Sequence, residues 1–349
     1  MRLRAITTAA VSAVLLVGCS VGAERERSIG AERTSVHAVG SRPAPVRIGV
    51  VLNYLDDPFF LAIYEGLRAE ARRLGARLTV RSVTSNAELA AQAAQLRALV
   101  AENRDCYVVN PITASNLVTA LRGISRPIVN VDSPIDPAAA QRAHVRVRTY
   151  IGTDDFAAGR LAGAQMVALL PRGGEVAAVG GLAGNVNSGV RLSGFQRGIR
   201  GSRVRVVARV NADYNRTKAQ IAAERILRAH PRLSGFFAAS DGMLLGIADA
   251  LRGAGRTGEV RVVGLDGAAE ALDHIRAGSI SADVSQYPYV MGTMAVDACV
   301  AAAGGARLPP RVDAPIALLT KANVARAIAA FPKPFQPYSN RFGRLLRRP

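Results

Sequence analysis

The chain has 349 residues, of which 49% are hydrophobic, with 33 glycines and no tryptophan. This length is enough for two domains with full cores, and the composition is that of a globular α/β protein. The formal net charge is +19 at pH 7. Because the basic residues are mostly scattered arginines without a DNA-binding motif, we predict a solvated basic surface and no nucleic-acid partner.

The N-terminus predicts export. Arg2 and Arg4 precede an apolar run from Ala5 to Val17, which is typical of a secretory signal and too short for a membrane span. The run ends in Leu16-Val17-Gly18-Cys19, which looks like the lipobox of bacterial lipoproteins. An ordinary signal peptide with a chance cysteine is the alternative.

We therefore expect residues 1–18 to be a lipoprotein signal peptide and Cys19 to carry the lipid. Residues 19–45 are rich in Ser, Gly, Ala and Arg and lack apolar periodicity, so they are expected to form a flexible tether. The mature protein would then be anchored on the outer face of the cell membrane.

From residue 46 onward, strand and helix patterns alternate. The first series comprises strand 46–52, a helix from Phe60 to Leu74, strand 78–83, helix 87–102, strand 107–109, a short helix near 115–123, and strands 128–131 and 149–151. The second comprises helix 156–170, strand 176–179, helix 190–199, strand 204–210, helix 217–229, strand 236–239, helix 243–253, strand 260–265 and helix 268–277. This alternation predicts parallel sheets with right-handed crossovers in two similar Rossmann-like lobes.

Polar or aromatic residues follow most of these strands. They are Asn53 and Asp57, Asn110, Asp132, Asp213-Tyr214, Ser240-Asp241, Asp266 and Gln286. One such residue is more often a helix cap than a binding group. Ligands of open α/β sheets bind at the carboxyl ends of the strands, and this many polar groups converge only if two such edges face each other. We therefore predict a ligand cleft between the lobes.

The sequence contains no motif that indicates catalysis or metal binding. The four histidines form no catalytic group, no nucleophile elbow or phosphate loop is present, and no Cys/His cluster has metal-ligand spacing. We therefore expect this protein to have no enzymatic activity and to bind no cofactor and no metal ion. Cys106 and Cys299 are expected to be buried free thiols, although export leaves a disulfide possible.

The body from Val46 to about Leu319 resembles the ribose-type sugar-binding proteins of ABC transporters, which have the type I periplasmic binding fold. The resemblance rests on Asp57-Pro58-Phe59-Phe60, Val109-Asn110-Pro111, Val131-Asp132, Gly194-Phe195, Phe237-Ala238-Ala239-Ser240-Asp241, Val263-Gly264-Leu265-Asp266-Gly267 and Gln286-Tyr287-Pro288. The lac-repressor family shares the fold but begins with a helix-turn-helix, which this chain replaces with a signal and a tether.

The resemblance implies a three-segment hinge, with crossings near 153–155, 286–288 and 313–315. The N-terminal lobe would then comprise 46–153 plus 288–314, and the C-terminal lobe 154–287 plus 315–330. Residues 331–349 are Pro-rich and then basic, and we expect them to be a frayed C-terminal tail.

The resemblance also implies a role for each site residue. Phe59, Phe60 and Tyr214 match aromatic residues that stack on a sugar, although Phe60 also fits the core face of its helix. Carboxylates and amides at matching positions would hold hydroxyls. The implied ligand-binding set is Asn53, Asp57, Phe59, Phe60, Asn110, Asp132, Ser133, Arg191, Tyr214, Ser240, Asp266 and Gln286.

Asp57 takes the place of a family amide, and four further positions depart from the family pattern. Gly189 and Ser133 stand where arginines are usual, Ser240 replaces Asn, and Leu265 replaces an aromatic residue. The pocket should therefore be less cationic and roomier than a ribose site, which favours another pentose, a hexose or a sugar alcohol.

The implied function is a monomeric, lipid-anchored solute-binding protein. It would capture a sugar or polyol by hinge closure and deliver it to an ABC transporter permease. The alternative is a receptor whose closure is read by a membrane sensor kinase.

Overall fold

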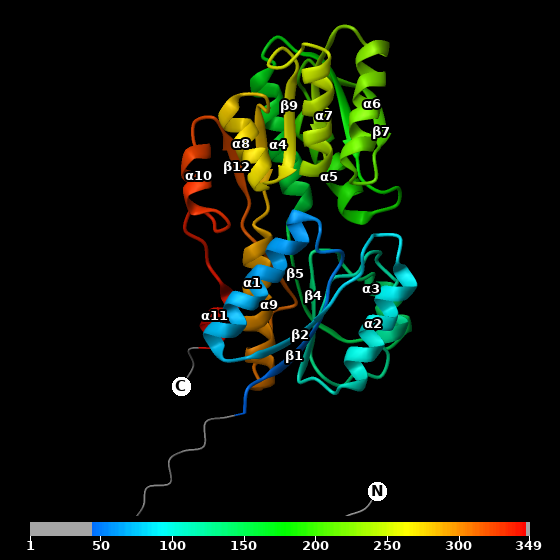
Figure 1. Ribbon diagram of the computed structural model, residues 1–349, viewed down its shortest axis with the longest axis vertical. Helices are drawn as coiled ribbons and strands as arrows, with labels where there is room; N and C mark the ends of the chain where they lie inside the picture. The colour runs from blue at the N-terminus through cyan, green and yellow to red at the C-terminus, as the bar shows by residue number, and fades with distance from the viewer. Residues whose placement is uncertain (1–43, 347–349) are drawn as a thin grey trace, which may run out of the picture. The chain divides into compact units, whose positions relative to one another are not determined.

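The computed structural model describes residues 44–346. The predicted signal peptide, Cys19 and nearly all of the tether lie outside the described residues. The described part folds into two α/β lobes, each built on a six-stranded sheet with helices packed against it (Figure 1). Between residues 44 and 346, no helix has the length and apolar character needed to cross a membrane.

The first lobe is built on a parallel sheet of strand order β11-β5-β4-β3-β1-β2. Its strands are β1 (Arg47–Val51), β2 (Arg77–Arg81), β3 (Cys106–Val109), β4 (Ile128–Val131), β5 (Val147–Gly152) and β11 (Arg311–Asp313). Its helices are α1 (Pro58–Leu74), α2 (Leu89–Ala101), α3 (Pro137–Arg142), α9 (Pro288–Ala303) and α11 (Arg341–Leu345).

The second lobe is built on a sheet of strand order β12-β10-β9-β8-β6-β7. Its strands are β6 (Gly174–Gly180), β7 (Val204–Asn211), β8 (Leu233–Ala238), β9 (Arg261–Asp266), β10 (Ala282–Ser285) and β12 (Ala317–Thr320). Its helices are α4 (Asp155–Leu169), α5 (Val186–Gly198), α6 (Arg216–Ala229), α7 (Asp241–Gly253), α8 (Ala269–Ala277) and α10 (Val324–Ala330). Strand β12 pairs with β10 in the antiparallel direction, which the alternation of elements did not predict.

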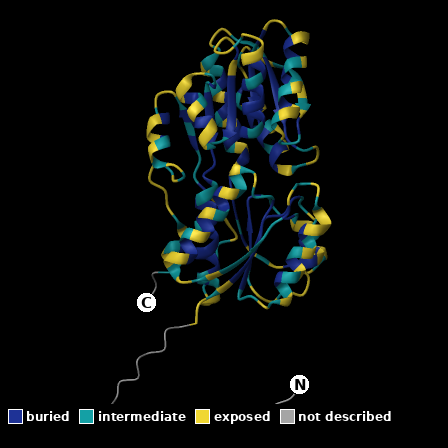
Figure 2. Ribbon diagram, in the orientation of Figure 1, coloured by how far each residue is buried: buried dark blue, intermediate teal, exposed yellow. Residues whose placement is uncertain are grey.

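The central strands are mostly apolar, with Asn130 of β4 an exception, because helices cover both of their faces. Every residue of β3 and of β4 is buried, and buried residues fill the middle of each lobe in Figure 2. Helices α4 and α5 pack closely because glycines meet at their crossing. A Cβ at Gly159 would overlap the Arg191 carbonyl, so this glycine allows the approach that places Arg191.

Two local expectations were inaccurate. The short helix expected near 115–123 is only a 3₁₀ turn over Thr119–Leu121. Helix α5 begins at Val186 rather than at residue 190, because the Asn185 side chain accepts a hydrogen bond from the Ser188 amide and caps the helix there.

The prediction of a frayed tail was wrong for the part of the tail that the structure describes. Residues 341–345 form α11, which packs on α9 of the first lobe, and Phe342 is fully buried. Asn340 caps α11 and donates a hydrogen bond of 2.6 Å to Asp297 Oδ2. This helix could not be predicted from the sequence, because it follows a Pro-rich stretch and is too short to show apolar periodicity.

The expectation of free thiols was also wrong. Cys106 in β3 and Cys299 in α9 are both fully buried and form a disulfide, with their Cα atoms 5.6 Å apart. The bond joins segments 193 residues apart in the sequence within the first lobe.

Loss of this disulfide should lower the stability of the protein. We expect the double variant Cys106→Ala/Cys299→Ala to lose about 2–4 kcal/mol of unfolding free energy, because the unfolded chain is no longer closed into a long loop. Urea unfolding of the oxidised wild type and the variant measures the difference. Equal midpoints would contradict the pairing.

Candidate functional site

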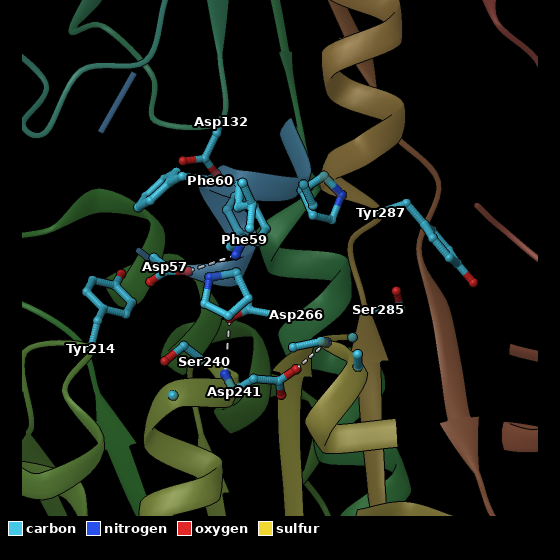
Figure 3. A pocket seen from close by; sticks show the side chains of 18 of the residues that line it. Asp57, Phe59, Phe60, Asp132, Tyr214, Ser240, Asp241, Asp266, Ser285 and Tyr287 are labelled. Atoms are coloured by element: carbon cyan, nitrogen blue, oxygen red, sulfur yellow. Dashed lines mark hydrogen bonds between the residues drawn. The ribbon is translucent and has the colours of Figure 1, made fainter. Parts of the chain in front are cut away.

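A cavity of about 600 Å³ lies between the two lobes and is lined by residues of both. In Figure 3, Phe59, Phe60 and Asp132 of the first lobe lie on one side, and Tyr214, Ser240 and Asp266 of the second lie on the other. Ten of the twelve predicted site residues line it, namely Asn53, Asp57, Phe59, Phe60, Asp132, Ser133, Arg191, Tyr214, Ser240 and Asp266. The carboxyl ends of the two sheets therefore meet at one cavity, as predicted.

The aromatic part of the first lobe is positioned by the start of α1. Asp57 caps this helix by accepting a hydrogen bond of 2.8 Å from the Phe59 amide, and Pro58 occupies its first position. The rings of Phe59 and Phe60 meet edge to face with centroids 5.6 Å apart. Burial raises the pKa of Asp57, which both caps the helix and lines the cavity.

Asp132 is a second carboxylate of the first lobe that lines the cavity. Its Oδ2 accepts hydrogen bonds from Asn110 Nδ2 at 3.2 Å and from the Ser133 hydroxyl at 3.3 Å. Burial raises the pKa of this carboxyl to about 6, against the lowering effect of Arg191. No donor among the described residues binds its other oxygen, so Oδ1 is left to accept from a molecule in the cavity.

Two predicted contact residues lie behind the cavity wall. Asn110 is fully buried, and its Oδ1 accepts a hydrogen bond of 2.8 Å from Asn53 Nδ2. Gln286 is also fully buried, and its amide bonds Arg191 and Asp266. Neither residue lines the cavity. Both bond residues that do, so in this structure they support the wall, and their direct contact with a ligand stays a prediction.

Arg191 is the most connected side chain of the site. Its Nε lies 2.6 Å from Asp155 Oδ1, and its terminal nitrogens donate to the Ala239 carbonyl at 2.9 Å and to Gln286 Oε1 at 3.0 Å. Burial would lower the pKa of Arg191, but Asp155 and Asp266 raise it. The guanidinium thus stays charged and holds two buried carboxylates in place.

Asp266 is a carboxylate of the second lobe that lines the cavity. Its Oδ1 lies 3.5 Å from Arg191, and its Oδ2 accepts from the Asp241 amide at 3.1 Å. Burial raises the pKa of Asp266 well above its usual value. Desolvation therefore raises the pKa of both Asp132 in the first lobe and Asp266 in the second.

Left-handed backbone conformations are concentrated at the cavity. Asp132, Tyr214 and Asp266 have φ values of 58°, 59° and 147°, which residues other than glycine rarely adopt. Strain of this kind is typical of binding sites, where it aims side chains at a ligand. The Tyr214 hydroxyl is fixed by a 2.7 Å hydrogen bond to Asn185 Oδ1.

The four departures from the family pattern differ in their consequences. Ser133 and Ser240 line the cavity, and a hollow of about 70 Å³ adjoins Ser133. Among the described residues the buried Ser240 hydroxyl has no partner, so it is available to a ligand. Gly189 is exposed and Leu265 is fully buried in β9, and neither lines the cavity. Of the two positions where arginines are usual, Ser133 therefore lines the cavity, and the effect inferred from Gly189 stays a prediction.

Several polar wall residues were not in the predicted set, among them Tyr54, Asn185, Asn187 and Asp241. Asn187 Nδ2 donates to the Asp132 carbonyl at 3.4 Å and so connects the lobes across the cavity. The capping position of Asn185 before α5 was the signal that could have identified this loop. Within residues 44–346, no cluster of acidic, histidine or cysteine side chains is arranged to hold a metal ion.

Comparisons with known proteins agree with this architecture. A family model described as a periplasmic binding protein domain matches residues 48–307. The D-allose-binding periplasmic protein of Escherichia coli is 31% identical over 279 residues, covering 78% of this chain and 89% of that protein. The ribose import binding protein of Bacillus subtilis is 28% identical and covers 78% of this chain and 87% of its own length.

Solved structures show the same fold. A solute-binding protein of an ABC transporter from Mycobacterium smegmatis, solved with bound glycerol, superposes with a TM-score of 0.74 at 28% identity, covering 84% of this chain and all of that one. One from Actinobacillus succinogenes with bound D-allose has a TM-score of 0.77 at 22% identity, covering 80% of this chain and 99% of that one. These relatives are binding proteins and not enzymes, and this chain belongs to the periplasmic binding protein family.

Proposed function

We propose that this protein is an extracytoplasmic solute-binding protein that captures a sugar or sugar alcohol and delivers it to the permease of an ABC transporter. The observation that carries the proposal is the composition of the cavity wall. Aromatic rings and carboxylates from both lobes face one space, and hydroxyl-rich ligands with apolar C–H faces need that combination.

The proposed contacts follow from the free atoms of the wall. Asp132 Oδ1 and the Ser240 hydroxyl would bind ligand hydroxyls from opposite lobes. Phe59, Phe60 and Tyr214 would pack on C–H faces. A ligand that bridges the lobes favours the closed arrangement and so shifts the hinge equilibrium.

The ligand class follows from the same wall and from relatives. The named relatives bind ribose or D-allose, and one solved relative holds glycerol. The small side chains of Ser133 and Ser240, with the hollow beside Ser133, leave more room than larger side chains would and so favour a ligand other than ribose. A hexose, a different pentose or a sugar alcohol fits these observations.

Anchoring by a lipid on Cys19 is part of the proposal. It rests on the lipobox-like Leu16-Val17-Gly18-Cys19 and the following tether, which would keep the folded body near its permease. A Cys19→Ala variant should be released from membranes into the medium or the periplasm, and fractionation with immunoblotting measures this. Retention of the variant on the membrane would contradict lipidation.

A thermal-shift screen of the mature protein against aldoses, ketoses and polyols tests the binding proposal. A ligand at 1,000 times its dissociation constant should add roughly 4 kcal/mol to the unfolding free energy. The proposal fails if no carbohydrate raises the midpoint while another class of metabolite does. Loss of import on gene deletion would support transport, whereas unchanged import with a lost transcriptional response would favour a sensor kinase as partner.

Binding should weaken as the pH falls below about 6. Burial raises the pKa of Asp132 to about 6, and protonation replaces a carboxylate acceptor by a neutral acid. A ligand hydroxyl that donates to the carboxylate favours its charged form, so affinity should rise with pH and level off above 6. Calorimetric titrations between pH 4.5 and 7.5 measure this. Constant affinity across the range would exclude Asp132 as the acceptor.

A further inference from the structure

The C-terminal segment crosses from one lobe back to the other. Helix α10 packs on α8 and β12 of the second lobe, and α11 packs on α9 of the first. In Figure 1 the red segment runs between these two helices. The three hinge crossings that the family resemblance implies end near residue 315, so residues 331–340 form a fourth connection between the lobes. This connection lies beyond residues 48–307, which the family model matches.

Both ends of this connection are fixed by buried contacts. On the second lobe, Val324 and Ala327 of α10 are buried. On the first lobe, Phe342 is 0% exposed, and Asn340 donates to Asp297, which is itself buried in α9. Each end is therefore part of the core of a different lobe, and the connection cannot detach from either without exposing apolar surface.

The connecting residues also form part of the cavity wall. Phe331, Pro332 and Lys333 line the cavity, and so do Leu61 of α1 and Leu272 of α8. The segment therefore borders the space between a helix of the first lobe and a helix of the second. Rotation that moves α1 away from α8 has to lengthen the path from α10 to α11 or release one of its ends.

We propose that residues 331–346 form a strap that limits how far the cleft opens and slows ligand release. The strap shifts the equilibrium between the open and closed arrangements of the lobes. It favours the closed one, because its free energy is lowest when the lobes are close. Its action does not depend on the identity of the ligand, and it goes beyond the capture of a sugar or polyol.

Small-angle X-ray scattering of the ligand-free protein tests the strap. A chain ending at Ala330 and the variant Phe342→Ala should both have a larger radius of gyration than the full chain. The exposed Arg341, on the same helix as Phe342, provides the matched control Arg341→Ala, which should scatter like the wild type. Circular dichroism establishes that each variant is folded.

The second readout is the dissociation rate of whichever carbohydrate the screen identifies. Removal of the strap should raise this rate by about fivefold or more, as expected for a coupling of 1 kcal/mol. Folded variants with unchanged scattering and unchanged release would overturn the strap. If the shortened chain does not fold, Phe342→Ala decides. The scattering experiment needs no ligand, so it tests the strap even if the proposed ligand class is wrong.

Discussion

Replacing Arg191 by methionine is expected to lower the unfolding free energy by about 3–5 kcal/mol, as for the removal of one partner from a buried ion pair. Methionine fills much of the same space but pairs with neither Asp155 nor Asp266. Two buried carboxylates would then lack their cation, and the Ala239 carbonyl would lose its donor. Urea unfolding at pH 7 measures the loss.

Arg197 provides the matched control because it lies on the same helix, α5, but is exposed. Its replacement by methionine should change the unfolding free energy by less than about 0.5 kcal/mol. Equal effects of the two substitutions would show that Arg191 does not hold the buried carboxylates. A larger loss for Arg191→Met at pH 7 than at pH 4 would support the ionic explanation, since protonation of the carboxylates removes their need for a cation.

Replacing Asp132 by asparagine should weaken carbohydrate binding by about ten- to a hundredfold. A hydrogen bond to a charged group contributes about 1.5–3 kcal/mol, and every 1.4 kcal/mol is a factor of ten. The amide oxygen can still accept from Asn110, so the ligand-free fold should keep its stability. Calorimetric titration of the wild type and the variant measures the change in affinity.

Ser133 is the neighbouring control, because it lines the same cavity but carries no charge. Ser133→Ala should weaken binding by less than tenfold. The rise of affinity with pH should also be smaller in Asp132→Asn than in the wild type, because the group with a pKa of about 6 is gone. Full affinity and an unchanged pH profile in Asp132→Asn would remove this residue from the site.

Much of the site could be predicted because of where parallel strands end. Apolar runs such as Ile48–Val51 identify buried strands, and the residues after them must lie at the carboxyl edge of the sheet. Asp132, Ser240 and Asp266 were found in this way, and all three line the cavity.

What could not be predicted depends on the direction of single side chains. Asn110 and Gln286 also follow strands, but they bond neighbouring side chains behind the wall. Leu265 lies one residue before Asp266 and therefore points to the opposite side of β9, into the core. Gly189 lies on the exposed side of α5, which depends on how the helix is rotated about its axis.

Long-range contacts explain the other failures. The Cys106–Cys299 pair requires that α9 return to the first lobe and pack against β3, a contact that no local pattern contains. Helix α11 has only five residues, and what stabilises it is the buried Phe342 and the bond from Asn340 to Asp297. Tertiary packing, rather than local propensity, decides such elements.

A crystal structure with the carbohydrate that most raises the unfolding midpoint would test the binding proposal most directly. We expect the ligand in the cavity between the lobes, with hydroxyls within hydrogen-bond distance of Asp132 and Ser240 and a C–H face against Phe59, Phe60 or Tyr214. A ligand bound outside this cavity, or one in contact with only one lobe, would contradict capture between the lobes.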